Sequence, residues 1–398
     1  MKKLLYFIVL GSLLSACGPQ VTENPIESEG LFTPTAEATN APEEAAAQLA
    51  SEEALPAIAE APIVESPVIL NIEMMDEANG WALTEQNLIR TDDGGVTWYD
   101  VTPQDLREVG YFVYFNFLDT NHAWMQLPDM NNLPNGGTLY RTSDGGLTWE
   151  AFATPFSDGL FHFIDEQNGW MMANLGAGAG SNAVSIFKTR DGGETWERTY
   201  TNDPNLEGAE NTLPLSGIKY FIVPLDVDTA WIGGVVYAPG ETYLFRTDNS
   251  GATWSNINLV LPENVTNSDI SMLGIVFVSQ SDGLLALRIT SDTPKTIVYR
   301  TANGGNTWEQ LPIEFDGYGQ LSTPSDTEMV FYMDSLFYVT DDAGATIQEV
   351  TPDVLFGDTI IDMNFVNARV GWVVTEDDNG RSLFRTEDGG ATWTQQLP

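Results

Sequence analysis

The sequence has a single cysteine, Cys17, so the chain cannot form an intramolecular disulfide. Its stability must therefore come from side-chain packing and hydrogen bonds. Histidine is almost as scarce: there are only His122 and His162, and neither has a partner at the spacing of metal ligands. These shortages exclude a disulfide scaffold, and we expect no metal and no other cofactor.

Basic residues are also few, with 16 Lys and Arg against 57 Asp and Glu, which gives a net charge of −41. Binding of nucleic acid needs a basic surface, and so does a face that docks on anionic lipid head groups. The composition argues against both partners. The same charge keeps the folded domain soluble and disfavours self-association, so we expect a monomer.

Long apolar runs are missing as well. The one candidate, residues 4–14, is too short to span a bilayer as a stable helix. It follows Lys2 and Lys3 and leads into Leu14-Ser15-Ala16-Cys17, which resembles the bacterial lipoprotein box. The resemblance implies a signal peptide over residues 1–16 and lipidation of Cys17, with an ordinary secretory signal as the alternative. We therefore expect export and a lipid anchor at the outer face of the cell membrane, or at the outer membrane if the host has one.

Residues 17–66 are rich in Ala, Glu, Pro, Thr and Ser and almost free of aromatic side chains. Such a segment cannot bury enough apolar surface to offset the entropy that ordering would cost. We predict a flexible tether here. About 50 residues of coil reach roughly 40 Å root-mean-square, enough to lift a domain clear of a membrane surface.

The remaining residues, 67–398, contain seven copies of one motif, which we call the corner motif. It reads Thr-x-Asp-x-Gly-x-Thr-Trp, and it recurs at residues 90–98, 141–149, 188–196, 246–254, 300–308, 339–347 (a worn copy) and 385–393. A short acceptor side chain at the third position can close a turn by accepting backbone N–H groups. The residues at this position are Asp93, Asp144, Asp191, Asn249, Asn303, Asp342 and Asp388.

A Gly-Trp or Ala-Trp pair, such as Gly80-Trp81, precedes most corners, and an alternating strand such as residues 111–117 precedes the pair. One repeat is thus four strands, A to D, in which the corner joins C to D. Repeats at roughly 40–58 residues predict an all-β fold, a seven-bladed β-propeller of four-stranded blades. The alternative is a two-sheet sandwich, but that fold would not require seven matched corners. Because the chain starts with strand A and ends with strand D, closure would rest on packing of the last blade on the first.

The combination of Gly-Trp with Arg-Thr-x-Asp-Gly-Gly-x-Thr-Trp resembles the Asp-box (BNR) repeat family over residues 67–398. It looks most like the subgroup of photosystem II stability and assembly factors and their bacterial relatives. The resemblance implies a propeller fold and a non-catalytic role in escorting a membrane protein or complex. The same corner also occurs in sialidases, xyloglucan-cleaving enzymes and sortilin-type receptors, so the motif specifies the fold more sharply than the function.

Loop length varies in a way that points to one face. The A–B turns are short, whereas the B–C loops (residues 128–137, 175–182 and 238–241) and the D–A connections (201–216, 262–268 and 314–319) are long and irregular. In a four-stranded blade these two loop types emerge on the same face, and variation on one face of a rigid scaffold is typical of binding. Simple tolerance of insertions is the alternative. The candidate contact residues are Met130, Leu133, Asn135, Tyr200, Asn205, Tyr237 and Tyr318.

Enzyme chemistry finds less support. A sialidase resemblance would imply three arginines that clamp the substrate carboxylate, but five of the eleven arginines occupy the same repeat position at the end of strand C. Xyloglucan-cleaving relatives carry two propellers, and this chain has room for one. Several acids on the variable loops could form a general acid–base pair, although chance pairing is expected among so many: Asp129, Glu207, Glu210, Glu314 and Asp316. We assign no catalytic residue and favour a surface lipoprotein that binds a protein or glycan, with a glycoside hydrolase as the alternative.

Overall fold

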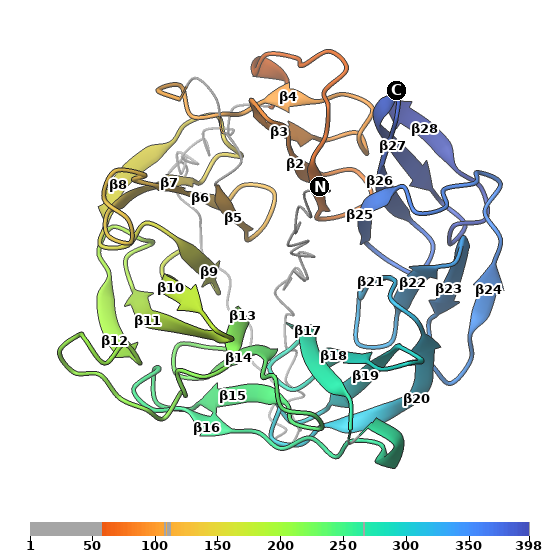
Figure 1. The fold of residues 1–398 in the computed structure, drawn as a ribbon. Coiled ribbons are helices and arrows are strands. Elements are labelled where there is room, and N and C mark those ends of the chain that lie inside the picture. The colour runs from red at the N-terminus through yellow and green to blue at the C-terminus, as the bar shows by residue number, and fades with distance from the viewer. Residues whose placement is uncertain (1–57, 107–108, 110–112, 266, 398) are drawn as a thin grey trace, which may run out of the picture.

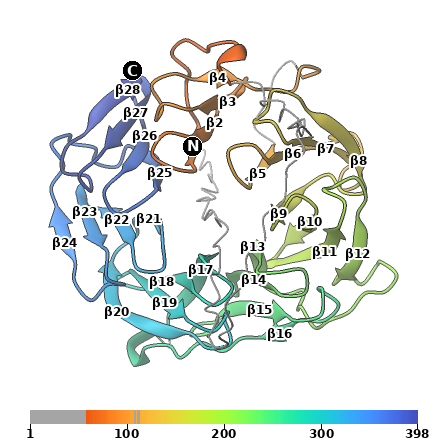
Figure 2. The same cartoon turned by 180° about the vertical axis from the view of Figure 1, so that it is seen from behind.

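The computed structural model describes residues 58–106, 109, 113–265 and 267–397. The predicted signal peptide, the predicted lipidation site Cys17 and most of the predicted tether lie outside the described residues. The described chain is a ring of β-sheets, and the colour order of the ribbon shows that it visits the sheets one after another around the ring (Figure 1). The view from behind shows the same order, with the first strand of each group innermost and the last at the rim (Figure 2).

Apart from the short 3-10 helices η1 (Ile58–Glu60) and η2 (Glu263–Val265), the regular elements of the described residues are all β-strands, so the all-β prediction is confirmed. We call each run of four consecutive strands a unit and number the units along the chain. Units 1 to 3 comprise β1 (Asn71–Met74), β2 (Gly80–Leu83), β3 (Leu88–Thr91), β4 (Tyr99–Asp100); β5 (Tyr114–Phe117), β6 (Ala123–Pro128), β7 (Gly137–Thr142), β8 (Glu150–Thr154); and β9 (Gly159–Phe163), β10 (Gly169–Gly178), β11 (Ser181–Thr189), β12 (Glu197–Thr201).

Units 4 and 5 comprise β13 (Ile218–Pro224), β14 (Ala230–Val235), β15 (Tyr243–Thr247), β16 (Ser255–Asn256); and β17 (Asp269–Phe277), β18 (Gly283–Thr290), β19 (Lys295–Thr301), β20 (Glu309–Asp316). Units 6 and 7 comprise β21 (Gln320–Ser322), β22 (Met329–Met333), β23 (Leu336–Thr340), β24 (Gln348–Val350); and β25 (Ile360–Phe365), β26 (Gly371–Asp377), β27 (Gly380–Thr386), β28 (Thr394–Leu397). Five units form separate four-stranded sheets, whereas units 4 and 5 are joined into one eight-stranded sheet by the pairing of Val235 with Ser271.

Burial follows the position of a strand within its unit. The second strand of unit 4, β14, is buried along its whole length, whereas the outer strand β20 alternates exposed and buried residues. A strand covered on both sides reads as a continuous apolar run, and a strand with one face in water alternates. The core therefore lies in the layers between neighbouring units. One such layer combines Trp231 and Leu244 of unit 4 with Ile270, Leu285 and Tyr299 of unit 5.

The ring closes between unit 7 and unit 1. The inner strand β25 lies beside β1, and Trp372 and Val374 share a buried cluster with Ile72 and Trp98. Oδ2 of Asp362 accepts the backbone N–H of Ile72 at 2.8 Å. Because the two units meet through side-chain packing and side-chain hydrogen bonds, closure is of the kind that the order of the strands predicts.

Residues 58–66, which the sequence assigns to the tether, lie against the outer edge of unit 1. The N–H of Val64 donates to the carbonyl of Trp98 at 2.9 Å, and the N–H of Asp100 donates to the carbonyl of Pro62 at 2.7 Å. The short edge strand β4 would otherwise present open backbone groups to solvent, and this segment satisfies them. Ordered structure therefore begins before Pro67. Across the described residues, the helices are too short to cross a membrane.

Successive strands run antiparallel, so the connections alternate between the two ends of the ring. We call the end with the A–B turns and the C–D corners the corner face. The opposite end, with the B–C loops and D–A connections, is the loop face.

Candidate functional site

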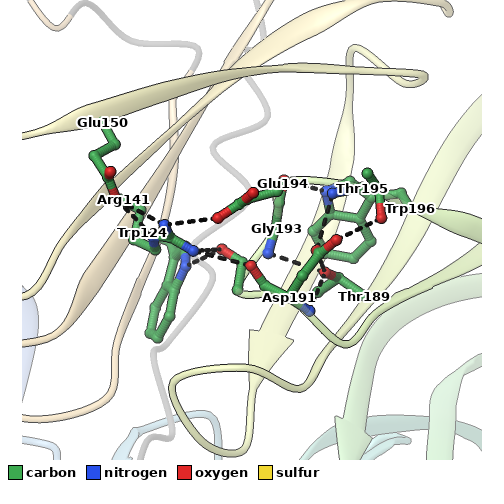
Figure 3. A network of polar contacts seen from close by, with 10 residues as sticks. Trp124, Arg141, Glu150, Thr189, Asp191, Gly193, Glu194, Thr195 and Trp196 are labelled. Carbon is green, nitrogen blue, oxygen red and sulfur yellow. Dashed lines mark hydrogen bonds and ion pairs between the residues drawn. The ribbon is translucent and has the colours of Figure 1, made fainter.

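Each corner is closed by hydrogen bonds to its third residue. In unit 3, Oδ1 of Asp191 accepts the N–H of Thr195 at 2.9 Å and the hydroxyl of Thr189 at 2.7 Å (Figure 3). The hydroxyl oxygen of Thr189 accepts the N–H of Gly193 at 2.9 Å, and Gly193 has φ +95°, a conformation that favours glycine. The equivalent oxygen accepts the equivalent two donors at Asp93, Asp144, Asn249, Asn303, Asp342 and Asp388.

The hydrogen bonds determine the charge state of these corners. Burial alone would raise the pKa of Asp144, but the hydrogen bonds from Thr148 and Thr142 outweigh it, and the pKa lies below its usual value. A carboxylate whose charged form is stabilised in this way is a poor proton donor or acceptor near neutral pH. The corner acids therefore serve the fold rather than acid–base chemistry.

A tryptophan and a basic residue of one unit hold the corner of the next. Nε1 of Trp124 in unit 2 donates to the carbonyl of Gly192 at 3.0 Å, and Nη1 of Arg141 donates to the carbonyl of Asp191 at 2.9 Å (Figure 3). The same bond joins Trp372 of unit 7 to the carbonyl of Gly94 in unit 1 at 2.9 Å. The strand-B tryptophans thus carry much of the contact between units.

Burial ranks the two kinds of tryptophan. The strand-B residues Trp81, Trp124, Trp170, Trp231 and Trp372 are at most 1% exposed. Among the corner tryptophans, by contrast, Trp149, Trp196 and Trp308 are only half-buried. The corner tryptophans are the ones that belong to the repeated motif, but the more deeply buried strand-B tryptophans are better placed to hold the units together.

The corner face is closed further by its A–B turns. The N–H of Gly192 in the unit 3 corner donates to the carbonyl of Gln167 in the A–B turn of the same unit, at 2.8 Å. The corresponding bond occurs in every unit, with donors Gly94, Gly145, Ser250, Gly304, Ala343 and Gly389 in the other six. Turn and corner therefore form one hydrogen-bonded layer, in which little backbone remains for a partner.

The loop face carries the predicted contact residues. Met130, Leu133, Tyr237 and Tyr318 are all exposed, Tyr237 by 66%. Asn135 and Asn205 are exposed as well. Apart from Met130, Leu133 and Asn135, which share one loop, these residues lie on different connections around the ring.

Tyr200 does not belong to that surface, so its assignment as a contact residue is corrected. It is 3% exposed. Its hydroxyl donates to the carbonyl of Glu210 at 2.9 Å and accepts the N–H of Leu213 at 2.8 Å. Tyr200 of β12 therefore anchors the connection formed by residues 201–216.

The loops of units 3 and 4 are bound to each other. Nζ of Lys219 donates to the carbonyls of Asn182 at 2.9 Å, Leu215 at 3.0 Å and Gly217 at 3.1 Å. No described carboxylate pairs with this amine, and burial lowers the pKa of Lys219 to about 7. Sequence reasoning missed Lys219, because a single lysine in an inner strand carries no motif.

The acids considered for catalysis are dispersed. Asp129 lies in unit 2 and its Oδ1 accepts the N–H of Asn131 at 2.9 Å, while Glu207 and Glu210 lie in the connection between units 3 and 4. Glu314 and Asp316 share the outer strand β20, where Glu314 forms an ion pair with Lys295. The structure therefore does not bring acids of different units together as an acid–base pair.

Metal-binding side chains are not gathered either. Among the described residues there is no group of three or more His, Cys, Asp or Glu arranged to hold a metal ion. His122 lies in an A–B turn, where its Nδ1 is 2.9 Å from Oδ2 of Asp119. It belongs to the hydrogen bonds of that turn.

Three comparisons place the fold. A family model described as the DUF6242 beta propeller domain matches residues 129–350. YCF48 bound to D1 peptide is similar to the chain with a TM-score of 0.50 at 16% identity, covering 82% of this chain and 94% of that one. YCF48 from Cyanidioschyzon merolae gives a TM-score of 0.51 at 16% identity, with coverage of 82% and 95%. No curated protein matches the chain by sequence.

A glycan-active enzyme has the same fold. The GH74 xyloglucanase from Xanthomonas campestris gives a TM-score of 0.56 at 12% identity, and the match covers 84% of this chain but only 55% of the enzyme. At such identities the likeness establishes the fold and not the activity. The predicted β-propeller is thereby confirmed.

Proposed function

The chain belongs to the family of DUF6242 beta propeller domains, and on that premise we propose a non-catalytic binding module whose seven units are the four-stranded blades. Its closed corners, together with the resemblance of their sequence, support assignment to the Asp-box repeats and to the subgroup that resembles photosystem II assembly factors. The partner is a protein or a glycan, and it docks on the loop face. We propose that the module acts as a monomer and does not bind nucleic acid.

One observation carries this proposal: large apolar side chains are exposed mainly on the loop face. That face presents Met130, Leu133, Leu215, Tyr237, Val260, Tyr318 and Leu355. Of the other exposed large apolar residues of the described chain, Val96, Val227 and Ile347 lie on the corner face, and Ile63 and Val68 lie in the segment that precedes β1. Exposed apolar side chains that gather on one side of a soluble scaffold are typical of an interaction surface.

The proposal extends to where the module works. The lipoprotein box at Cys17 and the composition of residues 17–66 support export, lipidation and a tether that presents the ring at the cell surface. A Cys17→Ser variant should leave the membrane fraction. Retention of this variant in the detergent phase would contradict the anchor without touching the binding proposal.

The binding face can be tested with a matched pair of variants of the anchored protein. Tyr237→Ala with Tyr318→Ala removes exposed rings from the loop face, and Val96→Ala with Ile347→Ala removes exposed apolar groups from the corner face. Envelope proteins cross-linked to each variant, and binding to a glycan array, are quantified against the wild type. A partner that is lost only from the loop-face variant supports the proposal; equal loss from both variants, or from the corner-face variant alone, contradicts it.

A glycoside hydrolase is the second candidate, favoured by the similarity in fold to the xyloglucanase. Aryl-glycosides and glucan oligomers are the substrates to assay. Turnover that disappears in Asp316→Asn or Glu207→Gln would establish an enzyme and displace the binding module. Turnover that persists in both variants would point to a contaminating activity.

A further inference from the structure

The junction between units 3 and 4 differs from its neighbours at two facing positions. At three other junctions the arginine that ends strand C lies against the first glycine of the next corner. A side-chain carbon placed on Gly94 would lie 3.2 Å from Nη1 of Arg385. Gly145 and Gly192 face Arg90 and Arg141 even more closely. In unit 3 the arginine is replaced by Lys188, and in unit 4 the glycine is replaced by Ser250.

The replacement of arginine by Lys188 leaves space at the junction between units 3 and 4. The ammonium group of Lys188 donates to the carbonyl of Val227 and lies 4.2 Å from the ring centroid of Trp170. A guanidinium that would bridge to the next corner, as Arg141 does, is therefore missing here. A cavity of about 340 Å³ opens on the corner face, lined by Lys188, Arg190, Thr195, Trp196, Glu197 and Ser250 among others.

The cavity has two cations in a chain that is otherwise strongly acidic. Arg190 is exposed and forms neither a hydrogen bond nor an ion pair with any described residue, so all of its N–H groups are available. It is also the only cation at the second corner position, where the other copies have Asp92, Ser143, Asp248, Ala302, Asp341 and Glu387. Burial lowers the pKa of Lys188 and the charge of Arg190 lowers it further, whereas the nearby carboxylates of Asp228, Asp226 and Glu197 act in the opposite direction.

Two acids that line the cavity, Asp191 and Glu197, differ in the partners of their carboxylates. The carboxylate of Asp191 is occupied by the donors of its own corner, Thr189 and Thr195. Glu197 is exposed at the mouth and forms no ion pair with any described residue. Asp226 and Asp228 of the neighbouring turn also act on Lys188. Arg190 therefore supplies the N–H donors of the cavity that have no partner among the described residues, and Trp196 supplies an apolar wall.

We propose that this cavity binds an oxyanion, a carboxylate, sulfate or phosphate, carried by a small polar molecule. Arg190 binds the oxyanion through two parallel N–H groups, and Lys188 contributes the second charge. A volume of about 340 Å³ exceeds what a bare inorganic ion fills and falls within the range of small-molecule sites. The site lies on the corner face, so it is independent of the partner proposed for the loop face.

Titration calorimetry of the full-length protein tests the proposal at constant ionic strength. The probes are sulfate, phosphate and D-glucuronate, with chloride and neutral glucose as their matched controls. We expect saturable binding of at least one oxyanion and none of chloride or glucose. Binding of glucuronate but not of the inorganic ions would identify a carboxylate on a sugar-sized carrier, whereas the reverse would identify sulfate or phosphate. Absence of saturable binding by all three probes would overturn the proposal.

Three variants locate the site. Arg190→Ala should weaken binding about tenfold or more, because hydrogen bonds from charged donors are the strong ones. Lys188→Arg with Ser250→Gly restores the pattern found at Gly94, Gly145 and Gly192, and it should fill the cavity and abolish binding. Arg369→Ala removes an exposed arginine from the same face and should bind as the wild type does. Unchanged affinity in Arg190→Ala, or an equal loss in Arg369→Ala, would refute the assignment even if the double variant failed to fold.

Discussion

The corner carboxylates and two buried charged groups near the loop face differ in how the fold shifts their pKa values. On the corner face, the hydrogen bonds to Asp93, Asp144 and Asp388 outweigh the effect of desolvation, and the pKa values of these carboxyls lie below the usual range. Near the loop-face end of the inner strands, burial lowers the pKa of Lys219 to about 7 and raises that of Asp362 to about 6. The carboxylates of these corners therefore add to stability, whereas burial of Lys219 and Asp362 costs stability at neutral pH. Lys188, on the corner face, is an exception, because burial lowers its pKa as well.

This difference suggests a division of labour. The corner face is built from repeated, locally satisfied turns. At four junctions a strand-B tryptophan (Trp81, Trp124, Trp170 or Trp372) donates to a carbonyl of the next unit. The loop face has irregular connections and most of the exposed large apolar side chains. Electrostatic cost and exposed apolar surface concentrate where a scaffold serves binding, because stability alone would select against both.

The largest expected effect on stability comes from a substitution that removes a contact on the corner side. Trp124→Ala should lower the free energy of unfolding by about 3–5 kcal/mol, because it removes a fully buried ring and its bond to the carbonyl of Gly192. Trp149→Ala should cost less, since Trp149 is only half-buried. Tyr237→Ala on the loop face is the control. Denaturant unfolding measures all three, and a smaller loss for Trp124 than for Trp149 would reverse the ranking.

The second prediction concerns how the free energy of unfolding depends on pH through Asp362. Because the pKa of Asp362 in the folded state, about 6, exceeds its unfolded value, its stabilising contribution is complete below about pH 4 and is lost as pH rises through 6. The difference corresponds to about 3 kcal/mol at pH 7. Asp362→Asn removes this titration and keeps an oxygen that can accept the N–H of Ile72.

We therefore expect Asp362→Asn to become more stable relative to the wild type between pH 4 and pH 7, as measured by urea unfolding at each pH. A wild type and a variant whose stabilities run parallel over this range would show that the fold does not raise the pKa of Asp362 and that closure carries no such cost. Asp129→Asn, the same substitution on an exposed loop, is the matched control.

The sequence predicted what is local and repeated. The seven corners could be located because each is closed within a few residues, and the alternation of strands then assigned loops to faces. Features that depend on distant pairing could not be predicted: the segment beside Trp98 at the edge of unit 1, the burial of Tyr200 under its own connection, and the joining of units 4 and 5 through Val235. Lys188 and Ser250 were visible as departures from the repeat, but only coordinates show that they face each other.

A smaller effect tests the hydrogen bonds of a single corner. Asp144→Ala should cost about 1 kcal/mol, as loss of a capping side chain does, because the N–H of Thr148 and the hydroxyl of Thr142 lose their acceptor. Asp144→Asn should cost less, since Asn249 and Asn303 make the same bonds at their own corners. Thermal unfolding above pH 5 resolves the two. Equal losses would mean that the charge, rather than the acceptor oxygen, closes the corner.

The smallest effect concerns exposed apolar residues. Leu355 on the loop face is 86% exposed, and Ile347 on the corner face is 43% exposed. Replacing either by Ser should change the free energy of unfolding by no more than about 0.5 kcal/mol, because little apolar surface becomes newly hydrated. If Leu355→Ser lost more than Ile347→Ser in denaturant unfolding, Leu355 would be packing against its own loop. The excess of apolar side chains on the loop face would then be a matter of folding, and it would no longer argue for a partner.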